Sequence, residues 1–185
     1  MYEKRKTNGL VLRFDFLYIC YMHILTLGNE CLKEKALPVK TIGPEYIGIS
    51  EELINTLHEG KGIGLAGPQV GLMERIFAIH IEGDIPRIFI NPSLIETSQE
   101  TLKLEEGCLS IPGIYTDVIR PRSVKIQAWN EKGRPFTLEA DGIMARVILH
   151  EYDHLEGILF IDRVSVQKKN RILAKMEKAV VSRRE

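Results

Sequence analysis

The sequence has little of several features that mark specialised classes of protein. It contains three cysteines, Cys20, Cys31 and Cys108, in 185 residues. An odd and sparse set cannot form the disulfide framework of a small secreted protein, so we expect a reducing, cytoplasmic setting. Lys plus Arg and Asp plus Glu balance at 25 each, so the overall charge indicates no polyanionic partner. Any basic surface must therefore be local.

The sequence also lacks a hydrophobic run that approaches the roughly 20 apolar residues of a membrane span. An apolar stretch near the N-terminus follows basic residues as in a signal peptide, but Arg13 and Asp15 interrupt it and no small-residue cleavage site follows. We hypothesise that residues 1–21 are a dispensable extension outside the core, of the kind that an upstream start codon adds. Residues 22–185, beginning at Met22, would then form a single domain with a sizeable core.

Helical periodicity occurs in three places. Ser50 precedes an apolar series that stops before Gly60, which predicts a capped amphipathic helix. A second helix is predicted from residue 142 to residue 155, with Asp141 as its N-cap. A last helix is predicted over about 166–181, because its apolar residues gather on one side.

Strand signals lie between the first and second of these helices. Residues 75–81 and 86–90 are rich in isoleucine and phenylalanine, which is typical of strands. Residues 124–128 and 136–140 alternate apolar and polar side chains around a turn composition at 130–133, which predicts a hairpin with one buried face. Because strands and helices do not alternate along the chain, we expect an α+β fold with mostly antiparallel sheets.

The strongest local signal is the run His-Glu-Tyr-Asp-His at residues 150–154 in the second predicted helix. Residues four apart lie on one helix face, so His150 and His154 can bind one cation. Glu151 lies beside them and can take a proton from water without being a ligand. The preceding turns are apolar, so we expect this helix to be buried. Buried histidines and glutamate are costly unless a bound group satisfies them, which favours a metal over a chance match.

A catalytic metal site needs a third protein ligand and one open position. Cys108 is one candidate, although a single cysteine is more often a buried, inert thiol. Glu177 in the last predicted helix is another, as in one group of zinc endopeptidases, although basic residues surround it. No histidine follows His154 in the sequence, so a third histidine downstream is excluded. The residues alone leave Cys108 and Glu177 both open.

Three segments together resemble the signature motifs of the peptide deformylase family. They are Gly-Ile-Gly-Leu-Ala-Gly-Pro-Gln at 62–69, Glu-Gly-Cys-Leu-Ser at 106–110 and His-Glu-Tyr-Asp-His-Leu-Glu-Gly at 150–157, in the family's order. The resemblance extends from about Met22 to the C-terminal helix. Gly67 departs from it, because the family usually has alanine there, and it completes a Gly-x-Gly-x-x-Gly string. No strand–helix–strand unit surrounds that string, so we expect no dinucleotide to bind.

The resemblance implies an α+β fold whose sheets pack around a central metal-binding helix, with residues 22–185 as one catalytic domain. It implies an enzyme that removes the formyl group from the N-terminal methionine of nascent polypeptides and releases formate. One divalent metal ion, Fe²⁺ in the cell with Zn²⁺, Ni²⁺ or Co²⁺ able to substitute, would be held by Cys108, His150 and His154. Hydroxide on the metal would attack the formyl carbon, with Glu151 as general base and acid.

The same resemblance implies roles for groups around the metal. The Gln69 amide and the Leu109 backbone N–H would stabilise the developing oxyanion, which needs donors in a dry pocket. Glu106 and Arg120 would form an ion pair that holds the turn carrying the cysteine. The competing interpretation of that pair is two solvated charges with little mutual stabilisation.

The resemblance also implies five substrate-binding residues, which are Ile63, Gly64, Gly107, Ile143 and Val147. The first two would pair with the substrate backbone as an added strand does, and the third would leave room for its approach. The last two would line a methionine pocket with Ile63, although plain core packing explains them equally well. Arg146 would face either the mouth of this pocket or Asp153.

The C-terminal helix is rich in basic residues, which are Lys168, Lys169, Arg171, Lys175, Lys178, Arg183 and Arg184. The simpler interpretation is a solvated helix face. The resemblance to deformylases favours contact with ribosomal RNA near the exit of the nascent chain. A non-catalytic, ribosome-associated module is the remaining alternative, but a structural metal site would fill its fourth position with protein and leave Glu151 without a role.

Overall fold

A computed structural model describes residues 22–181, with side chains as far as Met176. The hypothesis about residues 1–21 concerns residues outside this part and stays a prediction. The α-helices are α1 (Glu45–Glu59), α2 (Gly142–Leu155) and α3 (Val166–Val181), and the 3₁₀ helices are η1 (Glu30–Lys33), η2 (Gly67–Val70) and η3 (Phe160–Arg163). The strands are β1 (Gly64–Ala66), β2 (Ile76–Ile79), β3 (Arg87–Thr97), β4 (Thr101–Cys108), β5 (Ile111–Pro121), β6 (Ser123–Trp129) and β7 (Pro135–Asp141).

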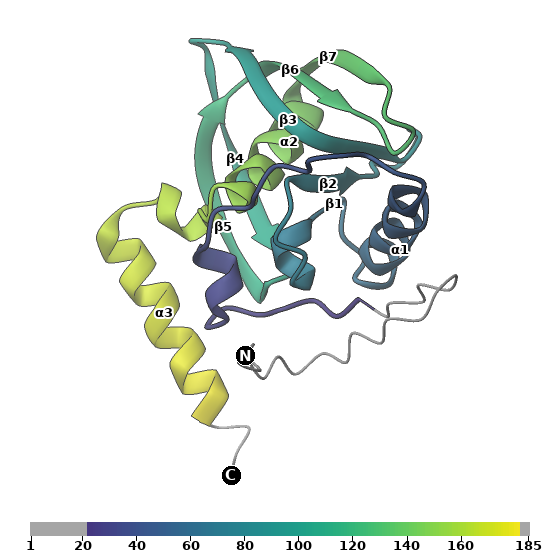
Figure 1. Ribbon diagram of the computed structural model, residues 1–185. Coiled ribbons are helices and arrows are strands. Elements are labelled where there is room, and N and C mark those ends of the chain that lie inside the picture. The colour runs from purple at the N-terminus through teal and green to yellow at the C-terminus, as the bar shows by residue number, and fades with distance from the viewer. Residues whose placement is uncertain (1–21, 182–185) are drawn as a thin grey trace, which may run out of the picture.

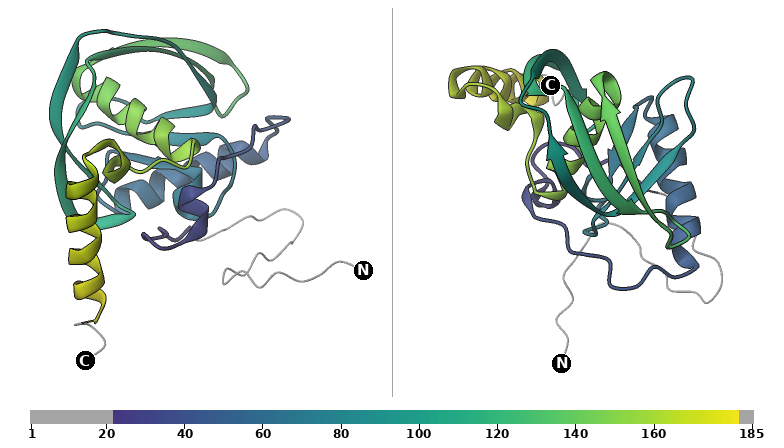
Figure 2. Two further views of the ribbon diagram at one scale, coloured as in Figure 1. Left: turned by 90° about the vertical axis from the view of Figure 1, so that its left-hand side faces the viewer. Right: turned by 90° about the horizontal axis from the view of Figure 1, so that it is seen from above.

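These strands form two antiparallel sheets. One has five strands in the order β1-β2-β3-β6-β7, and the other consists of β4 and β5. All the pairings within both sheets are antiparallel. The sheets curve around α2, while α3 extends away from both of them (Figures 1 and 2). The predicted α+β class, with a central helix and a C-terminal helix, is confirmed.

The core that fixes α2 is formed mainly by aromatic and branched side chains of the five-stranded sheet. Ile148 and Leu155 of α2 share one buried cluster with Phe77, Phe89 and Ile126. Phe77 and Phe89 stack on neighbouring strands with their ring centroids 4.6 Å apart. Each fully buried side chain of this size contributes about 1.5–3 kcal/mol. This packing holds α2 rigidly, which matters because α2 carries the histidines.

The predicted hairpin is found as β6 and β7, with Ile126 opposite Leu138. The predicted bounds of α2 and α3 are also confirmed. Asp141 occupies the N-cap of α2, but its side chain makes no capping hydrogen bond. Its carboxylate instead accepts a hydrogen bond from Arg122. Asp141 was therefore predicted correctly as the N-cap residue, but the capping hydrogen bond expected from its side chain is not formed.

The predicted start of the first helix is wrong. The N-cap was expected at Ser50, but α1 begins at Glu45 with Pro44 in the N-cap position. Proline is tolerated at a helix start because the first N–H groups have no partner within the helix. Ser50 lies inside α1, is 2% exposed, and its hydroxyl has no hydrogen-bond partner within residues 22–181.

Strands β4 and β5 were missed by the sequence analysis. In β5 the buried positions alternate, but Thr116 and Arg120 occupy two of them, so the apolar pattern is broken. The register of the two strands is irregular between Gly107 and Cys108. Such an irregularity re-aims the next side chain, and here it sets the direction of Cys108 at the end of β4.

Candidate metal centre

Two histidines of α2 face the same point. His150 and His154 are one turn apart, so their rings lie on one face of the helix, with centroids 5.1 Å apart. They are 8% and 1% exposed. Two imidazoles at this depth need polar partners, because burying an unsatisfied polar group costs free energy.

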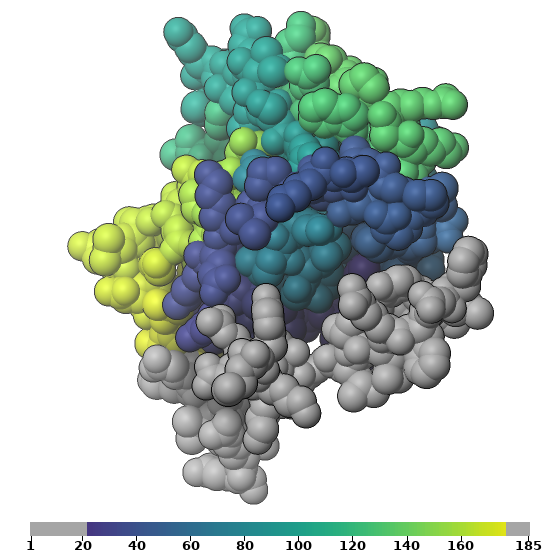
Figure 3. Space-filling view, in the orientation of Figure 1, coloured from purple at the N-terminus to yellow at the C-terminus, as the bar shows by residue number. Residues whose placement is uncertain are grey.

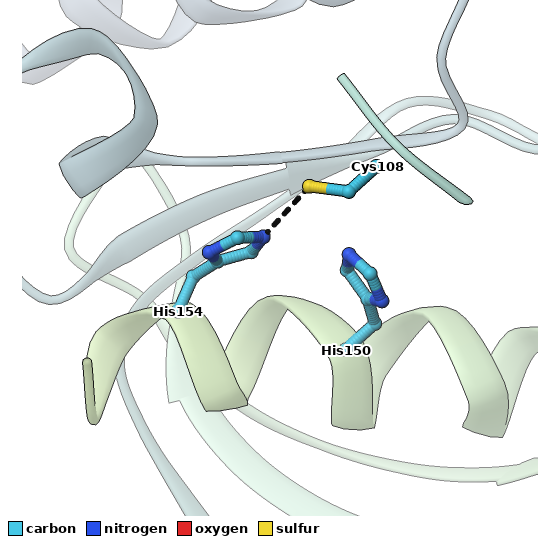
Figure 4. A group of neighbouring side chains, drawn as sticks. All are labelled: Cys108, His150 and His154. Carbon is cyan, nitrogen blue, oxygen red and sulfur yellow. Dashed lines mark hydrogen bonds between the residues drawn. The ribbon is translucent and has the colours of Figure 1, made fainter. Parts of the chain in front are cut away.

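Cys108 approaches these histidines from the end of β4 (Figure 4). Its Sγ lies 3.2 Å from Nε2 of His154. One possible ligand atom from each of Cys108, His150 and His154 lies within 4.8 Å of the others. Ligands of a tetrahedral zinc ion are about 3.3–3.8 Å apart, given bonds of about 2.0–2.3 Å. The group is therefore close to the spacing that one cation needs, and no other group of three metal-ligating side chains converges within residues 22–181.

Glu106 orients His150 through the ring nitrogen that does not face the other two ligands. Its Oε2 lies 2.8 Å from Nδ1 of His150, and Arg120 binds both carboxylate oxygens, at 2.6 and 2.9 Å. The structure places Glu106 and Arg120 in a buried, bidentate contact. Because the carboxylate engages Nδ1 of His150, the Nε2 nitrogen is left to face a cation, as in carboxylate–histidine–metal triads.

Charge in this network follows from its hydrogen bonds. Burial alone would raise the pKa of Glu106, but hydrogen bonds from His150 and Arg120 outweigh burial and hold that pKa far below its ordinary value. Burial alone would lower the pKa of His150, but hydrogen bonds to Cys108 and Glu106 raise it to about 10. Glu106 is therefore ionised and favours positive charge on the far side of the His150 ring.

Arg146 is a member of this network that the sequence analysis did not assign. It lines the cavity described below, which is one of the two placements considered for it from the sequence. It donates to Oε1 of Glu106 at 2.8 Å and to the carbonyls of Val118 and Leu102 at 2.9 and 2.6 Å. The signal for this contact in the sequence was an arginine within the apolar run of a helix. A buried arginine must be paired, so such a position indicates a buried acidic or carbonyl partner.

Glu151 lies beside the metal-ligating group and is 3% exposed. A Cβ on Gly64 would be 2.3 Å from its Oε1 and 2.8 Å from a methyl of Val147, so the glycine leaves the room that this carboxylate occupies. Burial raises the pKa of Glu151 to about 7, and burial with repulsion from His150 lowers that of His154 well below its ordinary value. Oε2 of Glu151 has no partner in the described part of the chain, which leaves it available to a group bound in the cavity. Nδ1 of His154 also has no partner there, but it is the ring nitrogen opposite the one that faces Cys108.

Gln69 presents its amide N–H groups to the same site. Its Oε1 accepts the Ala66 backbone N–H at 2.7 Å, which fixes the orientation of the amide. Its Nε2 then lies 3.2 Å from the Ser110 hydroxyl and 3.4 Å from Sγ of Cys108. Leu109 follows Cys108 in the chain and lines the adjoining cavity. Donors are therefore available beside the thiolate.

A cavity of about 460 Å³ opens in front of the ligand group. All five residues predicted to bind substrate line it, and these are Ile63, Gly64, Gly107, Ile143 and Val147. Ile143 is 51% exposed, so plain core packing does not describe it. Val147 is buried and belongs both to the core and to the cavity wall.

Gly67 begins η2, directly after β1. A Cβ on this residue would be 2.6 Å from the carbonyl oxygen of Leu72 and 3.0 Å from that of Glu74. The backbone of this chain therefore closes on a glycine, and alanine would require it to shift. The Gly-x-Gly-x-x-Gly string crosses a three-residue strand and a short 3₁₀ helix, which is not the strand-to-α-helix turn of a dinucleotide site.

Glu177, the alternative third ligand, belongs to α3. The structure describes side chains only as far as Met176, so the Glu177 side chain is not among them. Cys108 is the residue that the described structure brings to the two histidines. The alternative that uses Glu177 can be tested directly by metal retention.

One cysteine and two histidines around a cavity, with a buried glutamate beside them, define this protein as a candidate single-metal hydrolase on an α+β fold. The model of the polypeptide deformylase family matches residues 21–170. The chain belongs to the peptide deformylase family and is a hydrolase.

Several relatives agree with this membership. The peptide deformylase of Neisseria meningitidis is 44% identical over 159 residues, which are 85% of this chain and 95% of the relative. A crystal structure of a peptide deformylase from Legionella pneumophila matches with a TM-score of 0.82 and 31% identity, covering 89% of this chain and 98% of that one. The structure from Synechococcus elongatus, in complex with actinonin, has a TM-score of 0.80 and 39% identity over 84% of this chain and 88% of that one.

No helix within residues 22–181 combines the length and the apolar character that crossing a membrane would require.

Proposed function

We propose that this chain removes the N-formyl group from the N-terminal methionine of nascent polypeptides and releases formate, using one divalent metal ion held by Cys108, His150 and His154. The observation that carries the proposal is the convergence of these three residues beside the cavity, which Cys108 and His150 line, with Glu151 buried next to them. Membership of the deformylase family supports the same reaction.

The donor set fits a cation of a particular chemical class. One sulfur and two imidazole nitrogens suit zinc, iron, cobalt or nickel and disfavour magnesium or calcium. We propose Fe²⁺ as the ion in the cell, with the other three able to replace it. When bound, the ion supplies Lewis-acid activation of water and of the formyl carbonyl. The unpartnered and buried Oε2 of Glu151, beside the three ligands, supports a bound group at this place.

The residues of the chain move the proton and hold the developing charge. Glu151 accepts a proton from the attacking water and returns it to the leaving nitrogen, and its raised pKa suits both steps near neutral pH. The amide of Gln69 and the N–H of Leu109 donate to the negative charge that forms on the formyl oxygen. The hydrogen bond from Ala66 prevents the Gln69 amide from turning its oxygen toward that charge.

The substrate backbone is proposed to lie along β1. This strand is at the edge of the five-stranded sheet, so one side of it is available for an added strand. Gly64 at its start and Ile63 just before it would pair with the peptide. Gly107 lies across the cavity, and its lack of a side chain makes room for the ring of Tyr115. The methionine side chain would contact Ile63, Ile143 and Val147.

Formate release from formyl-methionyl peptides tests the proposed function. Protein purified without oxygen should release formate and leave a free methionyl N-terminus, at a rate proportional to the metal measured in the same sample. Cleavage of an internal peptide bond in a blocked peptide would instead favour the endopeptidase alternative. Metal-loaded protein that releases no formate would contradict the proposal.

We further propose that the exposed face of α3 contacts ribosomal RNA. This helix protrudes from one side of the protein, in yellow in Figure 3. Its Ile172, Leu173 and Met176 pack against a buried hydrophobic cluster. Lys168 and Arg171 lie on its exposed side, at the spacing of one helical turn. Cations on an extended helix are suited to phosphate contacts, which depend on salt.

Reversing two of these charges should weaken ribosome binding. We expect Lys168→Glu with Arg171→Glu to remove most co-sedimentation with ribosomes at low salt, because repulsion replaces two phosphate contacts. Lys132→Glu with Arg134→Glu, on the exposed turn between β6 and β7, changes the net charge equally and should not have this effect. Equal loss in both double variants, or none in either, would contradict a specific role for α3.

A further inference from the structure

A second pair of histidines meets outside the candidate metal centre. The chain has five histidines, of which His58 lies in the last turn of α1 and His80 follows β2. Nε2 of His58 is 2.6 Å from Nδ1 of His80, and the ring centroids are 4.8 Å apart. His58 is exposed and His80 is half-buried. Two imidazole nitrogens from different elements therefore converge at the surface.

Hydrogen bonding defines which nitrogen of His80 carries a lone pair. Its Nε2 lies 3.2 Å from the backbone carbonyl oxygen of Asp84, and a carbonyl can only accept. Nε2 of His80 therefore carries the hydrogen, and in the neutral ring Nδ1 presents its lone pair to His58. Histidines that bind metals are held in this way, with the other ring N–H donated to a carbonyl or a carboxylate.

We propose that His58 and His80 form a second, surface site for a divalent transition-metal ion of the zinc class, with water in the remaining positions. Nε2 of His58 now donates to His80, and on binding it would lose this hydrogen while its exposed Nδ1 takes one from water. The pair stays neutral, and both lone pairs then face the ion. Neutral nitrogen donors favour zinc, copper or nickel over magnesium and calcium.

The geometry requires the His58 ring to move. Two nitrogens on one tetrahedral zinc ion lie about 3.3 Å apart, against 2.6 Å in the present contact, and the two nitrogens, which now face each other, must both point at the ion. The exposed ring of His58 can make this movement by rotating about its side-chain bonds. His80 is less mobile, because both its ring and its backbone N–H are engaged. That backbone N–H donates to the carbonyl of Ile63 at 3.0 Å.

The charges near the pair are mixed. Asp84 forms an ion pair with Arg87, so its carboxylate is already engaged beside His80. The backbone N–H of Lys61 donates to the carbonyl of His58 at 2.9 Å, and its positive side chain is exposed. Binding must therefore rest on the imidazoles rather than on an acidic cluster. The bound ion would link the end of α1 to the residue that follows β2. Ile63, which lines the cavity, lies beside this link because its carbonyl accepts the backbone N–H of His80.

Zinc titration of the full chain without an affinity tag tests this site. The protein is first loaded with one equivalent of Zn²⁺, and calorimetry then follows a second equivalent. We expect the second equivalent to bind to the native chain and to weaken by about tenfold or more in His58→Gln and in His80→Gln, the usual minimum loss when support of a metal site is removed. His23→Gln removes an exposed histidine that is not a member of the pair and should leave the second equivalent unchanged.

Two further readouts make the result decisive. Both glutamine variants should keep the first equivalent and their melting temperature without zinc, which shows that they are folded. In nuclear magnetic resonance spectra, the second equivalent should shift the ring signals of His58 and His80. The proposal is overturned if the native chain binds no second equivalent, or if both variants bind it as the native chain does. Neither result would affect the proposed deformylase reaction.

Discussion

Glu151→Gln should lower kcat for formate release by about 10²- to 10⁴-fold, the range that general acid–base catalysis supplies. Glutamine keeps the volume of the side chain but cannot accept a proton from water. The carboxylate is not one of the three converging ligands, so metal content should stay at the native level. Kinetics and metal analysis on the same preparation measure both quantities.

The matched control for this variant is Glu105→Gln. Glu105 lines the same cavity but is exposed, so its replacement removes an equal charge without touching the buried position. We expect its kcat to stay close to the native value. If both variants lose activity equally, the effect is one of charge near the cavity. If Glu151→Gln stays fully active, Glu151 does not transfer the proton.

The predictable part of the site is the part that lies on one helix. His150 and His154 are four residues apart, and helical geometry alone brings them together. The bounds of α2 could be predicted because its apolar run and its flanking residues agree. Cys108 could be assigned only through the resemblance to a family, because sequence spacing does not show that the end of β4 meets α2.

The remaining errors come from polar groups in buried positions. β5 alternates as a strand should, but Thr116 and Arg120 take inward positions that an apolar pattern does not register. Arg146 lines the cavity, which was one of the two placements considered for it, and it also donates to Glu106, a contact that the sequence did not indicate. Asp153 accepts hydrogen bonds from Arg120 at 2.6 Å and from Arg163. Such contacts join residues far apart in sequence, so only the assembled fold defines them.

Glu106 shows why this buried network matters for function. One carboxylate holds His150 through Nδ1, while Arg120 and Arg146 compensate its charge. Burying an ionised group without such partners would cost several kcal/mol. From the sequence, Glu106 and Arg120 were expected to pair and to hold the turn that carries Cys108. The structure shows that this pair also positions the first histidine of α2.

Cys108→Ala should remove most of the metal from the purified protein and, with it, formate release. The thiolate is one of three converging ligands, and losing it should weaken binding by at least the 10- to 100-fold typical of lost supporting groups. Metal per chain after dialysis against a weak chelator gives the direct measurement. Cys31→Ala is the matched control, because Cys31 lies in η1 and outside the ligand group.

A site reduced to His150 and His154 would keep two imidazoles and no thiolate, which is the donor set proposed for His58 and His80. We therefore expect zinc to bind Cys108→Ala with an affinity similar to that of the surface pair, and far more weakly than the native site. Full metal content in Cys108→Ala, together with its loss in Glu177→Ala, would assign the third ligand to α3. The thiolate adds negative charge that two neutral rings lack. We therefore expect Cys108 to be the ligand that makes the native site retain its ion, whereas a site of two histidines exchanges its ion.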